Sequence, residues 1–302
     1  MTVRAGFVFI VAALIAACAT ATQTTTPSAP TTDFTSLTAQ FDYDRTAPTD
    51  ILAADAEEQP GVAVRSITFA SPRGGRANAL LFVPVGSGPF PAVVMMPGSN
   101  QPPAGFRPTA LELARRGAIV LVADQSQTRP GHTPLFSFTA ADRDEFVQTV
   151  VDVRREVDLL VARPDVDPRR VAFWGFSHGA FIGGILAGVE RRIASYVLQS
   201  GGGADYLRNN APQRLRDPDA LSAYLERIAT IDPALYVAHA APSAVLLQNG
   251  SLDRTYTAAG VAAWHTAASE PKKIVTYEAD HLLNAAATAD ALAWLASRIG
   301  TH

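Results

Sequence analysis

Residues 171–184, "VAFWGFSHGAFIGG", decide how the rest of the chain is interpreted. An apolar run typical of a buried strand leads into the pentapeptide GFSHG (175–179), and small and apolar residues follow it. One interpretation is a simple strand-to-helix turn, with glycines where the backbone bends. The other is that the turn holds the Ser177 hydroxyl out of the strand, because glycines two residues away on each side leave room for a strained serine backbone. We favour the second and treat Ser177 as a candidate nucleophile.

The composition limits the classes of protein that fit. The chain has 302 residues, of which 48% are hydrophobic and 18% charged, as in a globular protein with a large core. Its formal net charge is −3, which gives no indication of a nucleic-acid partner. Cys18 is the single cysteine, so we expect a mature chain without an internal disulfide or a thiol nucleophile.

Residues 1–17 have the layout of a secretory signal, in which one cation precedes an apolar run too short for a comfortable membrane span. The segment "LIAAC" (14–18) resembles the bacterial lipoprotein signal. This resemblance implies cleavage before Cys18 and attachment of a diacylglyceryl group to it, which would export the protein and anchor it to a membrane of the cell envelope. Ala19, in place of an aspartate, would favour the outer membrane in a Gram-negative cell. The alternative is an ordinary signal peptide that contains a cysteine, with a freely secreted or periplasmic product.

The residues that follow are rich in Thr, Ser, Ala and Pro and nearly free of large apolar side chains. Such a segment buries too little surface to offset its ordering entropy. The composition predicts a lipidated cysteine and flexible tether over 18–40 and one domain over 41–302.

The domain alternates strand and helix patterns. Residues 62–71 and 78–85 alternate polar and apolar positions around "PRGGRA", which predicts an antiparallel hairpin. Continuous apolar runs, typical of strands covered on both faces, occur within 90–100, 118–124, 170–175, 194–201, 243–250 and 273–280. Amphipathic helices are predicted within 108–117, 140–164 and 289–299.

This alternation predicts an α/β fold: a doubly wound, mostly parallel sheet with helices on both faces. Residues 201–241 are long, polar and partly helical in pattern, and they interrupt the alternation. Ligands bind at the carboxyl ends of the strands in open α/β sheets. If the insertion emerges at that end, we expect it to form a small lid over the site.

A serine hydroxyl becomes a good nucleophile only when a base takes its proton and a third group orients that base. His281 directly follows the last predicted strand, and Asp253 follows the strand before it. We select these two as base and acid. Asp205 and Asp280 are the competing acids, but Asp280 adjoins the histidine in sequence and so reaches its imidazole poorly. The other histidines are expected to have structural or solvent-exposed roles: His132, His239, His265 and His302.

From about residue 62 onward, the chain resembles the α/β-hydrolase superfamily, especially its dienelactone-hydrolase-like and small serine carboxylesterase branches. The matching segments are "PAVVMMPGS" (91–99), "LARRGAIVLVAD" (113–124), "GFSHGA" (175–180), "LLQNGSLD" (246–253) and "EADHLL" (278–283). The resemblance implies a Ser177/Asp253/His281 triad that hydrolyses a small-molecule carboxylic ester, with no metal and no organic cofactor. Dienelactone hydrolases proper use a cysteine nucleophile, so Ser177 argues against that activity.

The oxyanion hole departs from the family pattern. The family often has His-Gly after the third strand, whereas this chain has Pro97, which lacks an N–H, followed by Gly-Ser-Asn. The expected donors are the backbone N–H groups of His178 and Ser99, with Asn100 close behind. The side chain of His178 is expected to point away along the helix.

The residues leave other functions open. A peptidase or amidase, or an acyltransferase, would use the same triad. A non-catalytic binding protein of the cell envelope would keep the fold as a binding surface, without the catalytic activity. The chain length and the absence of a large cap favour small or short-chain acyl groups.

Overall fold

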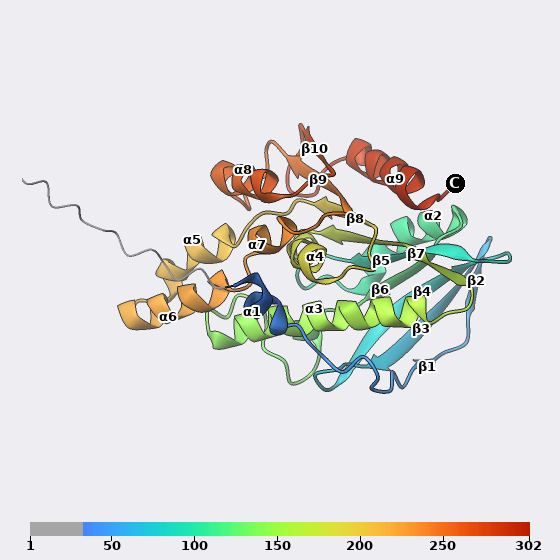
Figure 1. Cartoon of the computed structure of the whole chain (residues 1–302), viewed down its shortest axis with the longest axis horizontal. Coiled ribbons are helices and arrows are strands. Elements are labelled where there is room, and N and C mark those ends of the chain that lie inside the picture. Colours follow the sequence, from blue (N-terminus) through green and yellow to red (C-terminus); the bar gives the residue numbers. More distant parts are fainter. Residues whose placement is uncertain (1–32) are drawn as a thin grey trace, which may run out of the picture.

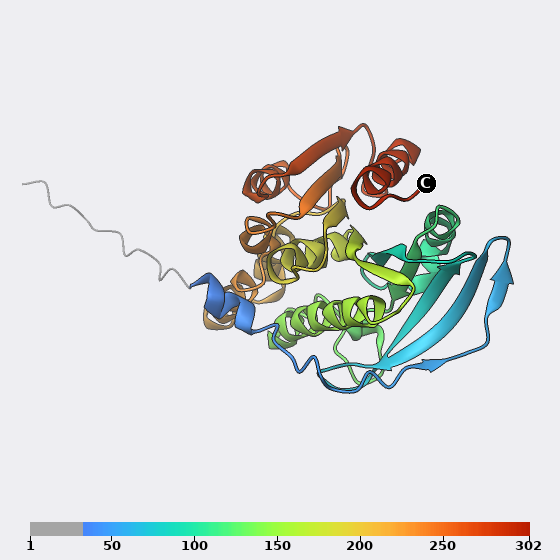
Figure 2. The same ribbon diagram turned by 45° about the vertical axis from the view of Figure 1, so that its right-hand side comes forward.

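A central ten-stranded sheet lies between two layers of helices in residues 33–302, the part of the chain that the computed structural model describes (Figure 1, Figure 2). The strands are β1 (Leu52–Ala53), β2 (Glu57–Gln59), β3 (Val62–Ala70), β4 (Arg76–Pro84), β5 (Phe90–Met96), β6 (Ile119–Ala123), β7 (Val166–Phe176), β8 (Ser195–Gln199), β9 (Ala244–Gly250) and β10 (Lys272–Tyr277). The helices are α1 (Phe34–Ala39), η1 (Pro103–Phe106), α2 (Arg107–Arg115), η2 (Ser126–Thr128), α3 (Ala140–Val161), α4 (His178–Val189), α5 (Asp205–Arg214), α6 (Pro218–Ala229), α7 (Pro233–Val237), α8 (Ala258–Ala267) and α9 (Ala285–Ile299).

The sheet order is β1-β3-β4-β6-β5-β7-β8-β9-β10, with β2 paired to β3. In the part of the sheet with the order β6-β5-β7-β8-β9-β10, every neighbouring pair of strands is parallel. Strands β3 and β4 form the antiparallel hairpin that the alternating pattern predicts. Strands β6 and β8 are buried along their whole length, because helices cover both faces. The predicted doubly wound, mostly parallel fold is therefore confirmed.

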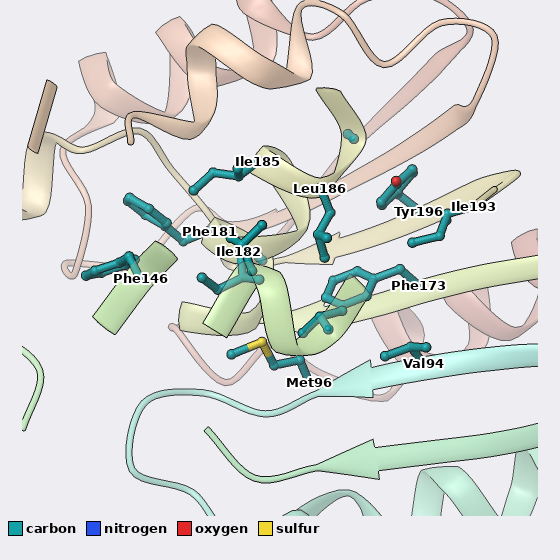
Figure 3. Close-up of a cluster of buried hydrophobic side chains, with 14 of the residues drawn as sticks. Val94, Met96, Phe146, Phe173, Phe181, Ile182, Ile185, Leu186, Ile193 and Tyr196 are labelled. Carbon is teal, nitrogen blue, oxygen red and sulfur yellow. The ribbon is translucent and has the colours of Figure 1, made fainter. Parts of the chain in front are cut away.

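The sheet separates two hydrophobic clusters. Helices α3, α4, α7 and α8 contribute to the larger cluster, and α2 and α9 to the smaller one on the opposite face. Figure 3 shows part of the larger cluster, where Ile182 and Leu186 of α4 lie beside Met96 on β5 and Phe173 on β7. This packing fixes α4 against the strand that precedes it.

The first described residues form a helix within the range that the composition predicts as a tether. Residues 34–39 form α1, although the composition predicts a tether up to residue 40. The ring of Phe34 stacks on that of His239 with centroids 3.7 Å apart, and Gln40 Nε2 donates to the Thr230 carbonyl at 3.0 Å. Contacts with residues that lie much later in the chain thus order a segment whose own sequence predicts no regular structure. Residues 34–39 therefore pack against the domain that the composition predicts from residue 41 onward.

The predicted signal peptide, Cys18 and the first part of the tether lie outside the described residues. Among residues 33–302, no helix combines the length and the apolar character needed to cross a membrane.

Helix α3 carries an acidic pair in its buried face. Asp152 accepts a hydrogen bond from Ser71 Oγ at 2.6 Å and pairs with Arg129. Glu156, one turn further on, is 1% exposed. Burial first, and then the negative charge of Asp152, raise the pKa of Glu156 well above its usual value, whereas Arg129 acts in the opposite direction. Burial therefore favours the neutral form of Glu156 in the folded protein.

This raised pKa makes stability depend on pH. Both states hold the Glu156 proton in acid, and as pH rises past the pKa of the unfolded state only the unfolded chain releases it, so stability falls. Each pH unit between the two pKa values costs about 1.4 kcal/mol. We expect Glu156→Gln to be more stable than the wild type at pH 8, with a smaller difference at pH 5, in urea unfolding. The exposed Glu58→Gln serves as the control, and an equal difference at both pH values for Glu156→Gln would contradict the assignment.

Candidate active site

Ser177 lies between the end of β7 and the start of α4 with φ 55° and ψ −111°, a conformation that side-chain-bearing residues rarely adopt. Its N–H donates to the Gln199 carbonyl at 2.8 Å. A Cβ on Gly175 would lie 2.2 Å from the Gly179 carbonyl oxygen, and a Cβ on Gly179 would lie 2.2 Å from that of Met96. The turn therefore requires glycine at both positions, and it holds the serine at the carboxyl end of β7.

His281, in the loop after β10, joins the serine to an acid. Its Nε2 lies 2.8 Å from Ser177 Oγ, and its Nδ1 lies 2.7 Å from Asp253 Oδ2. The Asp253 side chain is 4% exposed, and its Oδ1 accepts the Thr255 N–H at 2.8 Å. Both carboxylate oxygens are thus occupied, and the imidazole is oriented with one nitrogen toward the acid and the other toward the hydroxyl. In this arrangement an imidazole can take the hydroxyl proton.

The competing acids have other partners. Asp205 Oδ2 accepts from the backbone N–H of Thr257 at 3.1 Å and from its hydroxyl at 3.0 Å. Asp280 Oδ1 accepts the Leu282 N–H at 3.0 Å. The structure brings Asp253, and neither of the other two, to the imidazole of His281.

Ser200 supports the histidine loop and was not selected from the sequence. It is buried, has φ 52°, and its N–H donates to the Gln248 carbonyl at 2.7 Å. Its Oγ donates to the carbonyl of His281 at 2.6 Å. The one available signal was a serine placed directly before the three glycines 201–203, at the end of a buried strand.

Side-chain amides connect the four strands β7 to β10 near the site. Trp174 Nε1 donates to Gln199 Oε1 at 2.8 Å, and Gln199 Nε2 donates to Gln248 Oε1 at 2.9 Å. Gln248 Nε2 donates to the Tyr277 hydroxyl at 2.6 Å, which in turn donates to Asp290 at 2.7 Å. This amide ladder ties the strand before the serine to the strands before the acid and the histidine.

Two backbone N–H groups are available to a developing oxyanion. Neither the N–H of His178 nor that of Ser99 donates to a backbone carbonyl within residues 33–302, and both residues line one cavity with Ser177. Asn100 is exposed, has φ 59° and does not line that cavity. The geometry thus favours Ser99 over Asn100 as the second donor.

The loop that carries Ser99 is fixed from within the protein. Buried Gln125, in the segment between β6 and η2, donates from Nε2 to the Gly98 carbonyl at 2.6 Å. Gln101 Oε1 accepts the Gly98 N–H at 3.1 Å. The Ser99 N–H therefore has a defined position, although Pro97 cannot donate.

The His178 side chain is buried and packs edge-to-face on Phe146 with ring centroids 5.0 Å apart. Burial lowers its pKa to about 3, so the imidazole is neutral at physiological pH. His178 therefore adds no positive charge beside the nucleophile.

The cavity over Ser177 has a volume of about 200 Å³ and a mainly aromatic lining. Its walls are Ser99, Phe136, Phe146, Ser177, His178, Phe181, Tyr206, Leu207, Thr255, Tyr256 and His281. Tyr206 and Leu207 come from α5, so the insertion 201–241 does border the site. An open polar cleft adjoins the cavity at His281 and includes Asn210, Arg254 and Asp280.

Other features of the described residues do not compete with this site. An apolar cavity of about 360 Å³ between β3, β4 and α3 is lined by no candidate nucleophile, acid or base. Within residues 33–302, no group of three His, Cys, Asp or Glu side chains is arranged to hold a metal ion.

No family model matches the chain. Among curated proteins, it is 32% identical over 109 residues to the thiohydrolase apmlB of Arthrinium phaeospermum. That alignment covers 35% of this chain and 34% of the relative, so the chain spans about a third of the curated relative that it matches.

Solved structures match over most of the domain. Acetyl xylan esterase 1 from Thermoanaerobacterium sp. JW/SL YS485 has a TM-score of 0.76 at 21% identity, covering 88% of this chain and 93% of that one. The acetyl xylan esterase from Paenibacillus sp. R4 has a TM-score of 0.74 at 15% identity, with coverage of 87% and 92%. The glucuronoyl esterase from Solibacter usitatus has a TM-score of 0.66 at 13% identity, with coverage of 88% and 91%. These likenesses establish the α/β-hydrolase fold.

The close backbone approach at Gly175 makes the turn sensitive to a single methyl group. We expect Gly175→Ala to lower the free energy of unfolding by about 1–3 kcal/mol, because the added Cβ must displace the Gly179 carbonyl. Gly105→Ala is the matched control, since a Cβ there meets no atom within 4 Å. Urea unfolding measures both variants, and equal losses would contradict this account of the turn.

Proposed function

We propose that the protein is a serine hydrolase that cleaves carboxylic esters through an acyl-enzyme on Ser177. The observation that carries the proposal is the pair of contacts of His281, at 2.8 Å to Ser177 Oγ and 2.7 Å to Asp253 Oδ2. The names of the structurally similar proteins, two acetyl xylan esterases and a glucuronoyl esterase, support an ester as the substrate.

In this mechanism His281 Nε2 takes the Ser177 proton as Oγ attacks the acyl carbonyl. The backbone N–H groups of His178 and Ser99 bind the resulting oxyanion. The imidazolium, stabilised by Asp253, then donates its proton to the departing alcohol oxygen. Water, activated by the same imidazole, attacks the acyl-enzyme and releases the carboxylic acid.

The two hollows beside His281 suit the two halves of an ester. The aromatic cavity of about 200 Å³ is smaller than the roughly 300–1,000 Å³ of drug-sized sites and suits a small or short-chain acyl group. The leaving oxygen must lie within reach of His281 Nε2. We therefore place the alcohol toward the open cleft, whose lining includes Asn210, Arg254 and Asp280.

The proposal predicts serine-dependent turnover of p-nitrophenyl esters. Ser177→Ala is expected to reduce kcat/KM by at least about 10⁴-fold, and Asp253→Asn to reduce it by about 10⁴-fold, because the imidazole loses its orienting acid. Ser222→Ala, exposed on α6, is the control with unchanged activity.

The panel includes a thioester of the same acyl group, because the curated relative is named a thiohydrolase, together with amides and alcohol acceptors. Ester turnover that survives in Ser177→Ala would overturn the mechanism. Faster amide cleavage or acyl transfer would favour an amidase or an acyltransferase, and a folded protein inactive on the whole panel would favour a binding protein.

We also propose that the protein is exported and anchored to the cell envelope through a lipid on Cys18. The sequence of residues 14–18 supports this. On expression of the full chain in a bacterium, the mature N-terminus is expected at Cys18 with a lipid mass, in the membrane fraction. Cys18→Ser is expected to abolish lipid attachment, and an unmodified Cys18 in the wild type would contradict the proposal.

A further inference from the structure

The cavity over Ser177 has an aromatic wall built from two separate segments. Phe136 comes from the loop between η2 and α3, and Tyr206 comes from α5. Their rings meet edge-to-face with centroids 5.1 Å apart, and both line the cavity. An acyl group bound to Ser177 Oγ would extend within the space that this pair bounds.

The loop that presents Phe136 has an unfavourable backbone conformation. Phe136 has φ 64° and Phe138 has φ 55°, values in the left-handed region where bulky residues are genuine outliers. Each such residue costs about 1–3 kcal/mol and persists only where the surroundings hold it in place. Contacts from outside the loop itself must therefore hold it in place.

Asp142, in the first turn of α3, supplies those contacts. Its Oδ1 accepts the N–H and the hydroxyl of Ser137 at 2.8 and 2.7 Å, and its Oδ2 accepts the Phe138 N–H at 2.9 Å. The same Oδ2 accepts the Tyr224 hydroxyl of α6 at 2.8 Å. Asp142 is 1% exposed, so one buried carboxylate binds both the strained loop and a helix of the insertion.

The Tyr224 hydroxyl remains a donor in this contact. Burial, together with the neighbouring Asp142 charge, raises its pKa above the ordinary value. The insertion and the loop are further joined by the Phe138 and Tyr224 rings, whose centroids are 5.7 Å apart. Helix α6 also packs against α5, which carries Tyr206, so the two halves of the aromatic wall are linked through α6.

We propose that Phe136 and Tyr206 determine the length of acyl chain that the enzyme accepts, and that Asp142 is the positioning residue that holds this wall closed. The proposal rests on the proposed ester hydrolysis and adds the side chains that limit its acyl substrate. Truncation of either ring should lengthen the acyl site without touching the serine, the imidazole or the oxyanion donors.

The test is the ratio of kcat/KM for p-nitrophenyl hexanoate to that for p-nitrophenyl acetate. Phe136→Ala is expected to raise the ratio at least about 10-fold, since each methylene accommodated in an apolar pocket changes discrimination by about 10-fold or more. Tyr206→Ala is expected to act in the same direction, and its helical position carries no positive φ, so it remains informative if the Phe136 variant folds poorly. Phe34→Ala, which removes a ring from α1, is the control with an unchanged ratio.

The positioning role has its own readout. Asp142→Ala is expected to raise the same ratio and Tyr224→Phe to raise it partially, whereas Asp142→Asn, which keeps an acceptor oxygen, should restore part of the wild-type preference. A merely structural role would lower turnover of both esters equally and leave the ratio unchanged.

Two failures are distinguishable. Unchanged ratios in both ring variants, with Ser177-dependent turnover intact in the wild type, would overturn the aromatic wall alone. A wild type without Ser177-dependent ester turnover would overturn the proposed hydrolase and the wall together.

Discussion

The hydrogen bond from the Ser177 N–H to the Gln199 carbonyl is the contact on which the rest of the site depends. It is made at a φ of 55°, which is reached because two glycines let the backbones of β7, α4 and the end of β5 approach one another closely. The apolar packing of α4 against the sheet keeps that approach closed (Figure 3). The amide ladder extends the same constraint across four strands, so the serine, acid and histidine share one framework.

Much of this framework is readable from the sequence because it follows local rules. The apolar run at 118–124 predicts the strand found at Ile119–Ala123, and 62–71 with 78–85 predicts the hairpin β3–β4. Since the carboxyl ends of parallel strands meet at one edge, residues that follow β9 and β10 approach the turn after β7. Asp253 and His281 are predicted on this basis, and the structure brings both together with Ser177.

The remaining features depend on contacts that no local pattern encodes. Helix α1 is ordered by the contact of Phe34 with His239, a residue that lies much later in the chain. Ser200 is linked to His281 only because the two loops are adjacent in space. Phe136 and Tyr206 lie in segments whose composition indicates a loop and a polar helix. The contact between their rings depends on Asp142, whose carboxylate accepts hydrogen bonds from both the Phe138 N–H and the Tyr224 hydroxyl. Each case requires the three-dimensional neighbourhood rather than spacing along the chain.

The aromatic pair Phe136 and Tyr206 and the group Ser177, Asp253 and His281 lie on different parts of the polypeptide. The serine, acid and histidine follow β7, β9 and β10, whereas the aromatic pair lies on the loop before α3 and on the helical insertion at the left of Figure 1. Mutations in the second set can accumulate without moving the first. Under the proposed function, the residues that react and the aromatic pair that limits the acyl site thus lie on separate segments of the fold. Substitutions that reshape this end of the cavity can therefore be confined to two segments outside the sheet, which leaves the strand ends beside Ser177, Asp253 and His281 unchanged.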